Sequence, residues 1–488
     1  MSKKYDVVVI GAGPAGYVAA IRCTQLGMKV ACVDKWVTGQ RHCLGGTCLN
    51  AGCIPSKALL ESSELYHSTR EDIQKFGIKV SAVELDLEKM MAHKDQVVRD
   101  LNQGIDGLFK SSNIEVFTGH GKLLQGNKVE VAGLDKTAPV VPEVIDAQHI
   151  ILAPGSVPVD IGAAPLQDDI IVDSTGALAF KEVPKRLGIV GAGIIGLELG
   201  SVWRRLGAEV ILFEAQDSFL AMADDQIAKE AQKQFTKQGL DIRLSVRVTR
   251  ATVETGSDGN SVRVDYQQGS DGDVREASEV VDKLIVAVGR RPNTDRICSD
   301  DSGLILDEWG VIHVDEQCRT NLPEVYAIGD AVKGPMLAHK GSEEGIMVAE
   351  VIAGHVGKVN YATIPSVIYT HPEIAWIGST EHHLKDLGID YHRGVFPFAA
   401  NGRARAVGNT VGMIKILADA TTDRILGVHM IGPNCSEIIS AAGVAMSFGA
   451  SSEDIAMTMF AHPTLAEAFH EAAQAVADGA IHVARTRK

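Results

Sequence analysis

The sequence lacks any apolar run long enough to span a bilayer, and its 488 residues include only eight cysteines. The missing run argues against a membrane-spanning helix. Basic residues are also scarce, because 47 Lys and Arg face 62 Asp and Glu and leave a formal charge of −15. That balance argues against nucleic acid or an anionic membrane surface as the main partner. Eight cysteines in so long a chain do not make a disulfide scaffold, so a close pair is expected to be catalytic, redox-active or metal-binding.

Length and composition suggest several domains that each bury a core. Hydrophobic residues make up 45 % of the chain, and 488 residues are too many for one ordinary core. A strand is expected to begin near Tyr5, which leaves little room for a leader segment. We therefore expect a cytoplasmic protein of three or four domains.

Two segments repeat at a constant offset of 180 residues. YDVVVIGAGPAGYVAAIRCTQLGMKVACVDK begins at residue 5, and RLGIVGAGIIGLELGSVWRRLGAEVILFEA begins at residue 186. The offset pairs Gly11 with Gly191, Gly13 with Gly193, Gly16 with Gly196 and Asp34 with Glu214. Each copy is typical of an apolar strand, a glycine-rich turn, a helix and a second strand that ends in an acid, which is the context of a dinucleotide-binding fingerprint. The repeat therefore predicts two nucleotide-binding units.

The residue types of the repeat fit a pyrophosphate and a ribose. The first two glycines permit a tight turn and a close approach of the backbone, and the third lets the helix pack against the strand. The helix N-terminus offers N–H donors to phosphate. Asp34 and Glu214 are placed to accept hydrogen bonds from adenosine ribose hydroxyls. A carboxylate at Glu214 disfavours the 2′-phosphate of NADP, although two arginines (Arg204, Arg205) lie on the preceding helix.

The stretch GGTCLNAGCIPSK, residues 45 to 57, holds Cys48 and Cys53 within the first unit. Residues five apart in an ideal helix have Cα atoms roughly 8.6 Å apart, whereas a disulfide needs less than about 7 Å. If the two bond, the backbone must bend around residues 50–52. The helix that follows is expected to be capped near Pro55 and Ser56, and its N-terminus together with Lys57 would lower a thiol pKa. The nearest histidine, His42, fits no zinc spacing, so no metal site is expected.

Other short motifs end in turns. HIILAPGS, KLIVAVGRRPN and EVYAIGDAV each predict a buried strand that enters a turn, at residues 149–156, 283–293 and 324–332. Asp330 follows the last of these strands. Alone it is typical of a turn or cap aspartate, but with two dinucleotide units upstream a contact with a ribose or ribityl hydroxyl is the better interpretation.

The C-terminal part differs in texture. From about Tyr361 the pattern is α+β, with strands around a turn at 421–423 and a helix from about Ser436 to Phe448. No glycine fingerprint recurs there, so assembly is its expected role. In AHPTLAEAFHEAA, residues 461 to 473, Glu467 on a helix could orient the imidazole of His462 as an acid/base. By spacing alone, a capped helix start with a structural histidine is the commoner reading of that motif.

Taken in order along the chain, these motifs resemble the flavin-dependent pyridine nucleotide–disulfide oxidoreductases, and the resemblance covers essentially the whole sequence. It implies an α/β fold with two Rossmann-like dinucleotide-binding domains, a central domain and a C-terminal α+β dimerisation domain. The expected bounds are 1–158 for the FAD domain with the redox cysteines, 159–286 for the NAD domain, 287–356 for a central domain that completes the FAD site, and 357–488 for the interface domain.

The resemblance also implies roles for individual residues. FAD would contact Gly11, Gly13, Gly16, Asp34, Lys57, Gly155 and Asp330, and NAD would contact Gly191, Gly193, Gly196, Glu214 and Gly289. Cys48 would exchange with substrate and Cys53 would face the flavin, the two forming a redox disulfide. His462, oriented by Glu467, would be the acid/base contributed by the other subunit of a homodimer. Lys57 and Glu198 would form an ion pair beside the isoalloxazine.

The branch of the family that matches most motifs passes electrons from dihydrolipoyl groups to NAD⁺, within 2-oxo-acid dehydrogenase complexes or the glycine cleavage system. No lipoyl domain precedes Tyr5, so the lipoyl carrier, an acyltransferase or a glycine cleavage carrier protein, is expected to be another chain. The alternative is an NAD(P)H-dependent disulfide reductase of the glutathione reductase type, which Glu214 opposes. Mercuric and large thioredoxin reductases need additional C-terminal redox residues, and no cysteine follows Cys435. An alternative outside the enzymes is a scaffold protein, whose two domains bind partners without catalysing a reaction.

Overall fold

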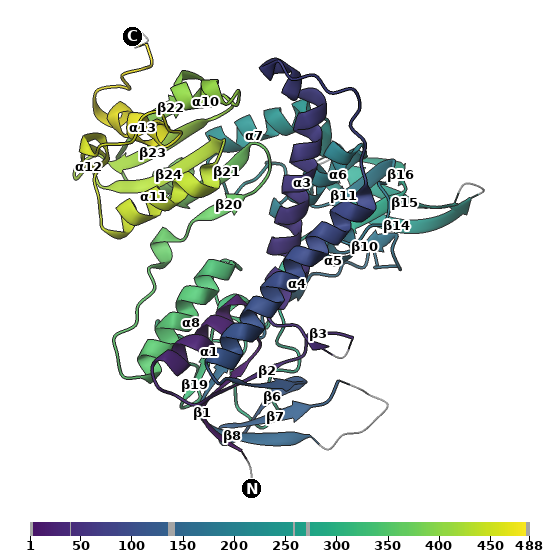
Figure 1. Cartoon of the computed structure of the whole chain (residues 1–488), viewed down its shortest axis with the longest axis vertical. Helices are drawn as coiled ribbons and strands as arrows, with labels where there is room; N and C mark the ends of the chain where they lie inside the picture. The colour runs from purple at the N-terminus through teal and green to yellow at the C-terminus, as the bar shows by residue number, and fades with distance from the viewer. Residues whose placement is uncertain (1–2, 40, 135–141, 257–258, 270–273, 485–488) are drawn as a thin grey trace.

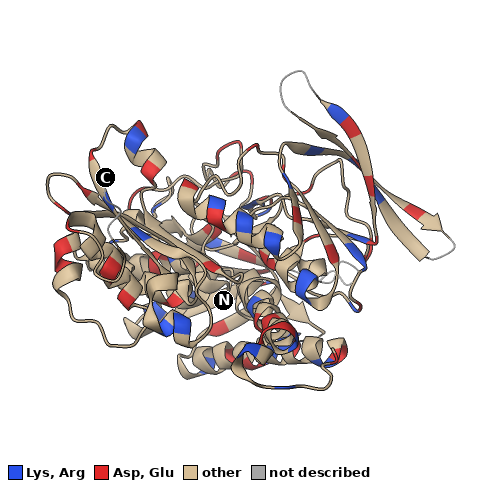
Figure 2. Cartoon of the chain, turned by 90° about the horizontal axis from the view of Figure 1, so that it is seen from above, with Lys and Arg blue, Asp and Glu red and all other residues tan. Residues whose placement is uncertain are grey.

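The computed structural model describes residues 3–39, 41–134, 142–256, 259–269 and 274–484. The chain is built around three large sheets (Figure 1). Within the described residues, no helix has both the length and the apolar character needed to cross a membrane. Lys and Arg are interspersed with Asp and Glu over the helices and strands (Figure 2), so the acidic excess is spread over the molecule.

The first sheet has a parallel core that carries the first glycine turn. Its order is β5-β2-β1-β8-β7-β6, with β19 pairing with β8. The parallel strands are β1 (Lys4–Ile10), β2 (Val30–Asp34), β5 (Glu115–Thr118), β8 (Glu143–Leu152) and β19 (Val325–Ala327), while β6 (His120–Leu124) and β7 (Lys128–Ala132) are antiparallel. Successive residues of β1 are buried on both faces, as an apolar run in a parallel sheet requires. Helix α1 (Pro14–Gln25) follows the glycine turn.

The second sheet repeats this plan. Its order is β10-β17-β11-β12-β13, all parallel, with bounds β10 (Ile171–Val172), β11 (Arg186–Val190), β12 (Glu209–Phe213), β13 (Leu240–Arg243) and β17 (Lys283–Val286). The order β12-β11-β17 matches β2-β1-β8 of the first sheet. The antiparallel strands β14 (Val246–Gly256), β15 (Gly259–Gln268) and β16 (Arg275–Val281) extend from it as a ribbon (Figure 1). The two predicted nucleotide-binding units are therefore present.

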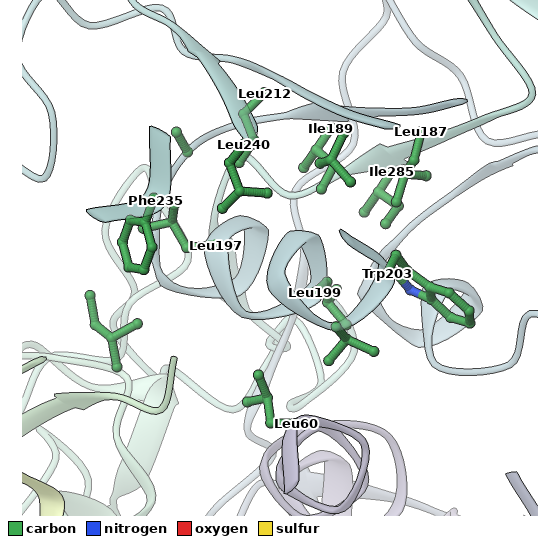
Figure 3. Packing of buried hydrophobic residues seen from close by; sticks show 14 of the residues in the cluster. Leu60, Leu187, Ile189, Leu197, Leu199, Trp203, Leu212, Phe235, Leu240 and Ile285 are labelled. Carbon is green, nitrogen blue, oxygen red and sulfur yellow. The ribbon is translucent and has the colours of Figure 1, made fainter. Parts of the chain in front are cut away.

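Helix α6 (Ile194–Leu206) lies at the centre of the largest hydrophobic core (Figure 3). Leu197, Leu199 and Trp203 of this helix pack among strand residues such as Ile189, Leu212 and Leu240, with Phe235 of α7 (Asp225–Lys237) and Leu60 of α3 (Cys53–Glu71) beside them. Since α3 belongs to the cysteine motif, this core joins the cysteine segment to the second sheet.

The third sheet is antiparallel, as the α+β texture predicts. Its order is β20-β21-β24-β23-β22, with bounds β20 (Ser366–Ile368), β21 (Glu373–Gly378), β22 (Tyr391–Pro397), β23 (Met413–Asp419) and β24 (Ile425–Gly432). Helices α9 (Glu381–Asp386), α10 (Gly402–Ala406), α11 (Cys435–Ser447), α12 (Ser452–Met457) and α13 (Glu467–Ala477) accompany it. The expected α/β fold class with a C-terminal α+β part is confirmed.

Helix α8 (Ala338–Ile352) packs closely along α1 and reaches the turn that holds Asp330. A Cβ on Gly345 would lie 2.6 Å from the Ala15 carbonyl oxygen, so only glycine permits this approach. Lys340 Nζ donates to the Gly329 carbonyl at 2.9 Å, and Glu344 accepts from the Gly329 N–H at 2.8 Å. The two side chains also pair with each other at 3.1 Å and are fully buried. This ion pair therefore binds both the N–H and the carbonyl oxygen of Gly329, the residue before Asp330.

Replacing Lys340 by methionine is expected to lower the free energy of unfolding by about 3–5 kcal/mol, because it leaves the Glu344 carboxylate buried without its partner. Lys385 offers a matched control, since it pairs with Glu381 at the same i,i+4 spacing but is 62 % exposed. Lys385→Met is expected to cost less than about 1 kcal/mol. Denaturant unfolding of both variants checks this, and equal losses would contradict it.

Candidate active site

A cavity of about 2030 Å³ lies between the first two sheets. Most of the residues that the sequence singles out line it together, namely Gly11, Gly13, Asp34, Cys48, Cys53, Lys57, Gly155, Gly191, Gly193, Glu198, Glu214, Gly289 and Asp330. Gly16 and Gly196 do not line it, because they lie where the helices pack onto the turns. His462 and Glu467 do not line it either.

Both glycine turns have the same close contacts. Gly11 has φ of +104°, and a Cβ there would lie 2.1 Å from the Ala153 carbonyl oxygen. Gly191 has φ of +101°, and its Cβ would lie 2.5 Å from the Ala287 carbonyl oxygen. The third glycine of each turn packs on the first, since a Cβ on Gly16 or Gly196 would lie about 2 Å from that residue's carbonyl oxygen (1.9 and 2.1 Å). The matching contacts explain why glycine is required at both places.

The middle glycines are open toward the cavity. A Cβ on Gly193 would meet no protein atom within 4 Å, and one on Gly13 would come only within 3.9 Å of Gly46. These two glycines are the N-caps of α6 and α1, and neither helix start has a side-chain cap. The first N–H groups of both helices are therefore available to an anionic ligand in the cavity, which fits the pyrophosphate of FAD and of NAD.

The acidic residue after each second strand is held by the same pair of backbone contacts. Asp34 accepts hydrogen bonds from the N–H groups of Ala12 and Trp36 at 2.7 and 2.8 Å. Glu214 accepts from Ala192 and Gln216 at 2.8 and 2.9 Å. A carboxylate has about four acceptor positions, so each retains capacity for ribose hydroxyls. The shorter Asp34 makes the same backbone contacts as the longer Glu214.

Asp330 belongs to a network that the sequence does not reveal. It lies in the short 3₁₀ turn η2 (Gly329–Ala331) directly after β19 and accepts a hydrogen bond from the Ser156 hydroxyl. Arg290 Nε donates to that hydroxyl at 2.8 Å, and its Nη2 donates to the Ser156 carbonyl at 2.7 Å. Arg290 stands inside the GRRPN motif, so its position could have suggested a role. Ser156 carries no such signal.

The cysteine pair lies where two helices meet. Helix α2 (Gly46–Ala51) contains Cys48, and α3 begins directly at Cys53. Gly52 interrupts the helical path within the segment where the spacing predicts a bend, and a Cβ there would lie 2.9 Å from the Thr47 carbonyl oxygen. The cap predicted near Pro55 and Ser56 is wrong, because the N-cap of α3 is Gly52 and proline is tolerated in the first turn of a helix.

Both cysteines are free thiols in the structure. The neighbouring Cys48 thiol lowers the pKa of Cys53 to about 7, and the Lys57 ammonium adds to this effect against burial and the charge of Glu198. The Cys53 thiol, together with burial, raises the pKa of Cys48 above its usual range. Of the two thiols, Cys53 at the N-terminus of α3 therefore ionises more readily.

The expected ion pair of Lys57 and Glu198 is present, and both charges act on Cys53. Lys57 Nζ lies 2.9 and 3.1 Å from the two carboxylate oxygens of Glu198. The Glu198 side chain is only 5 % exposed, and that of Lys57 is 31 % exposed. Because Lys57 lies on α3 and Glu198 on α6, the pair connects the cysteine segment to the second nucleotide-binding unit.

His462 and Glu467 pair at the surface of the part of the chain that forms the third sheet. His462 Nδ1 lies 2.8 Å from a Glu467 oxygen, and the Thr464 N–H donates to the other oxygen at 2.7 Å. Burial would raise the pKa of Glu467, but these two hydrogen bonds outweigh it and hold the pKa below its usual value. The His462 side chain is 77 % exposed, so its imidazole is free to meet groups from outside its own chain.

The fold and the site define a class: an oxidoreductase with two dinucleotide turns and a dithiol that face one cavity. The chain belongs to the pyridine nucleotide-disulphide oxidoreductase family, whose model matches residues 5–345 and whose dimerisation domain matches residues 364–473.

Curated relatives are similar over the full length. A dihydrolipoyl dehydrogenase of Cupriavidus necator is 49 % identical over 484 residues, covering 98 % of each chain. A mitochondrial dihydrolipoyl dehydrogenase of Arabidopsis thaliana is 46 % identical, covering 99 % of this chain and 92 % of that one. A leghemoglobin reductase of Vigna unguiculata is 46 % identical over 98 % of this chain and 88 % of its own. Among solved structures, an HOCl-induced flavoprotein disulfide reductase from Escherichia coli aligns with a TM-score of 0.82 at 26 % identity, covering 97 % of this chain and all of the other.

Proposed function

We propose that the chain is a dihydrolipoyl dehydrogenase, which oxidises dihydrolipoyl groups and reduces NAD⁺. The observation that carries this proposal is that the neighbouring thiols of Cys48 and Cys53 line one cavity together with both fingerprint turns. The full-length similarity to dihydrolipoyl dehydrogenases supports it. FAD is assigned to the first turn and NAD to the second.

The thiol steps use the chain's own residues. A dihydrolipoyl thiolate attacks the Cys48 sulfur of the Cys48–Cys53 disulfide, so that a mixed disulfide forms and Cys53 leaves as a thiolate. The second substrate thiol then loses its proton to His462. It attacks the substrate's own first sulfur in the mixed disulfide, so that the lipoyl disulfide forms and Cys48 leaves as a thiolate. The substrate dithiol is thereby oxidised by two electrons, and the cysteine pair is reduced by two.

The remaining roles follow from the electrostatics at the pair. Cys53 is the better leaving group because its thiol has the lower pKa of the two. Lys57 stabilises that thiolate, and Glu467 fixes the orientation of the imidazole of His462. When bound, FAD would supply the two-electron redox chemistry between the cysteine pair, which closes again to its disulfide, and NAD⁺.

A second copy of this chain is the proposed source of the acid/base. In the dimerisation domain, large apolar side chains that precede the AHP motif along the chain are exposed, including Phe448 (89 %) and Met459 (96 %). Contact with a second copy would remove them from water. A homodimer that buries them would carry His462 of one copy toward the cysteines of the other.

The lipoyl group is proposed to arrive on another protein, an acyltransferase of a 2-oxo-acid dehydrogenase complex or the carrier of the glycine cleavage system. We also propose a cytoplasmic location, which fits a chain with few cysteines and no disulfide scaffold.

Purified protein with FAD, NAD⁺ and dihydrolipoamide tests the function directly. NADH formation at a rate far above that with NADP⁺ is expected. A flavin-loaded protein that forms no NADH, but reduces glutathione disulfide with NADPH, would overturn the proposal in favour of a glutathione reductase type of enzyme.

The cofactor preference is expected to depend on Glu214. Glu214→Ala removes the acceptor for the ribose hydroxyls, so kcat/KM for NAD⁺ should fall about 10- to 100-fold, the value of a hydrogen bond to a charged group. The value for NADP⁺ should fall less, because the repulsion of its phosphate is also removed. Glu209→Ala, at the exposed start of the same strand, serves as the control. An unchanged ratio of NAD⁺ to NADP⁺ would contradict the assignment.

A further inference from the structure

Tyr369 brings the dimerisation domain of the same chain to the redox site. It directly follows β20, and it lines the cavity together with Cys53, Lys57 and Glu198. Nothing in the sequence marks it, since it lies 171 residues beyond Glu198 along the chain.

Tyr369 touches both members of the ion pair. Its backbone N–H donates to Glu198 Oε1 at 3.0 Å, and this oxygen also accepts from Lys57 at 3.1 Å. Its ring lies under the ammonium, with Lys57 Nζ 4.5 Å from the ring centroid. A cation over an aromatic face is attracted to it, more strongly where the cation is partly shielded from water. The ammonium also donates to the Ser56 hydroxyl at 3.4 Å.

The charge at Cys53 depends on where this ammonium lies. Cys48 and Lys57 favour the Cys53 thiolate, and Glu198 opposes it. Among the described residues, Arg290 of β18 (Arg290–Pro292) and Tyr369 also interact electrostatically with Cys53. An ammonium that drifts from the ring into solvent would be screened, and the carboxylate of Glu198 would then act on the thiolate with less opposition.

We propose that Tyr369 is a positioning residue, which holds the Lys57–Glu198 pair so that the ammonium stabilises the Cys53 thiolate. This rests on the proposed function and deepens it, because the dimerisation domain then contributes to the thiol site of its own chain as well as to the contact between copies. The face of the aromatic ring holds the Lys57 ammonium in place, and the tyrosine hydroxyl is not required.

The test is the pH dependence of Cys53 alkylation by iodoacetamide in the reduced, flavin-loaded, full-length protein, with peptide mapping to read Cys53 separately from Cys48. Tyr369→Leu removes the ring and is expected to raise the apparent pKa of alkylation by about 0.5 to 1, the size of a cation–π contact. Tyr369→Phe keeps the ring and is expected to leave that pKa where it is in the native protein.

Two outcomes overturn the proposal: no shift in Tyr369→Leu, or an equal shift in Tyr369→Phe, which would assign the effect to the hydroxyl. Tyr369→Met gives the same reading if the leucine variant does not fold. Alkylation needs no dihydrolipoyl substrate. A native protein that fails to oxidise dihydrolipoamide would therefore contradict the proposed function. The alkylation profile would still test the role of Tyr369.

Discussion

Cys48→Ser is expected to lose dihydrolipoamide-dependent NADH formation by about 10³-fold or more, as enzymes do when the atom that forms the covalent intermediate is removed. A serine oxygen cannot take part in thiol–disulfide exchange, so neither the mixed disulfide nor the internal disulfide can form. The variant should still bind FAD, because the first glycine turn does not involve Cys48. Steady-state rates and the flavin content of the purified protein are the measurements.

Cys43→Ser is the matched control for this loss. Cys43 is a partly exposed thiol five residues before Cys48, and its sulfur contacts only the Arg41 carbonyl among the hydrogen bonds described. Its replacement is expected to leave turnover within about twofold of native. A Cys48→Ser protein that keeps more than a tenth of native turnover would show that electrons reach NAD⁺ without the cysteine pair.

His462→Gln is expected to lower kcat by about 10²- to 10⁴-fold, the usual contribution of a positioned acid/base. Without the imidazole, the substrate thiols must lose their protons to water. His482 offers a matched control. Its side chain is exposed, and its Nδ1 lies 2.6 Å from Glu471, which is on the same helix as Glu467. His482→Gln is expected to change kcat less than twofold. Similar losses in both variants would contradict the assignment of His462.

Mixed dimers extend this prediction to the second copy. A dimer of one Cys48→Ser chain and one His462→Gln chain has one site with both defects and one with neither, if each site takes its histidine from the other chain. Such dimers should recover about half of native activity, although each parent is inactive. No recovery would show that the cysteines and the histidine act within one chain.

The sequence predicts the nucleotide-binding framework well because glycine at those positions is a steric requirement. Gly11 and Gly191 approach carbonyl oxygens too closely for any side chain, so the 180-residue offset in sequence reappears as matching geometry. The spacing of the cysteines predicts a bend around residues 50–52 if the two bond, since cysteines five apart cannot meet along an unbroken helix, and Gly52 separates α2 from α3.

Contacts made through backbone groups or between distant segments could not be predicted. Tyr369 reaches Glu198 through its N–H, which every residue but proline carries. The Ser156 hydroxyl bonds Asp330, 174 positions away, through a small residue of a common type. Pro55 predicts a cap too far along the chain, because it lies inside the first turn of α3, which begins at Cys53. His462 does not line the cavity that holds the cysteines of its own chain, so the structure of one chain does not bring it to the thiols.

The most direct measurement is the thiol state of Cys48 and Cys53 after oxidised, flavin-loaded protein meets one equivalent of dihydrolipoamide without NAD⁺ and without oxygen. Acid quenching, alkylation and peptide mapping report both cysteines. The account predicts that both become alkylatable while dihydrolipoamide is converted to lipoamide, and that adding NAD⁺ closes the pair again and yields one NADH. Conversion of the substrate with the cysteine pair unchanged would contradict the account.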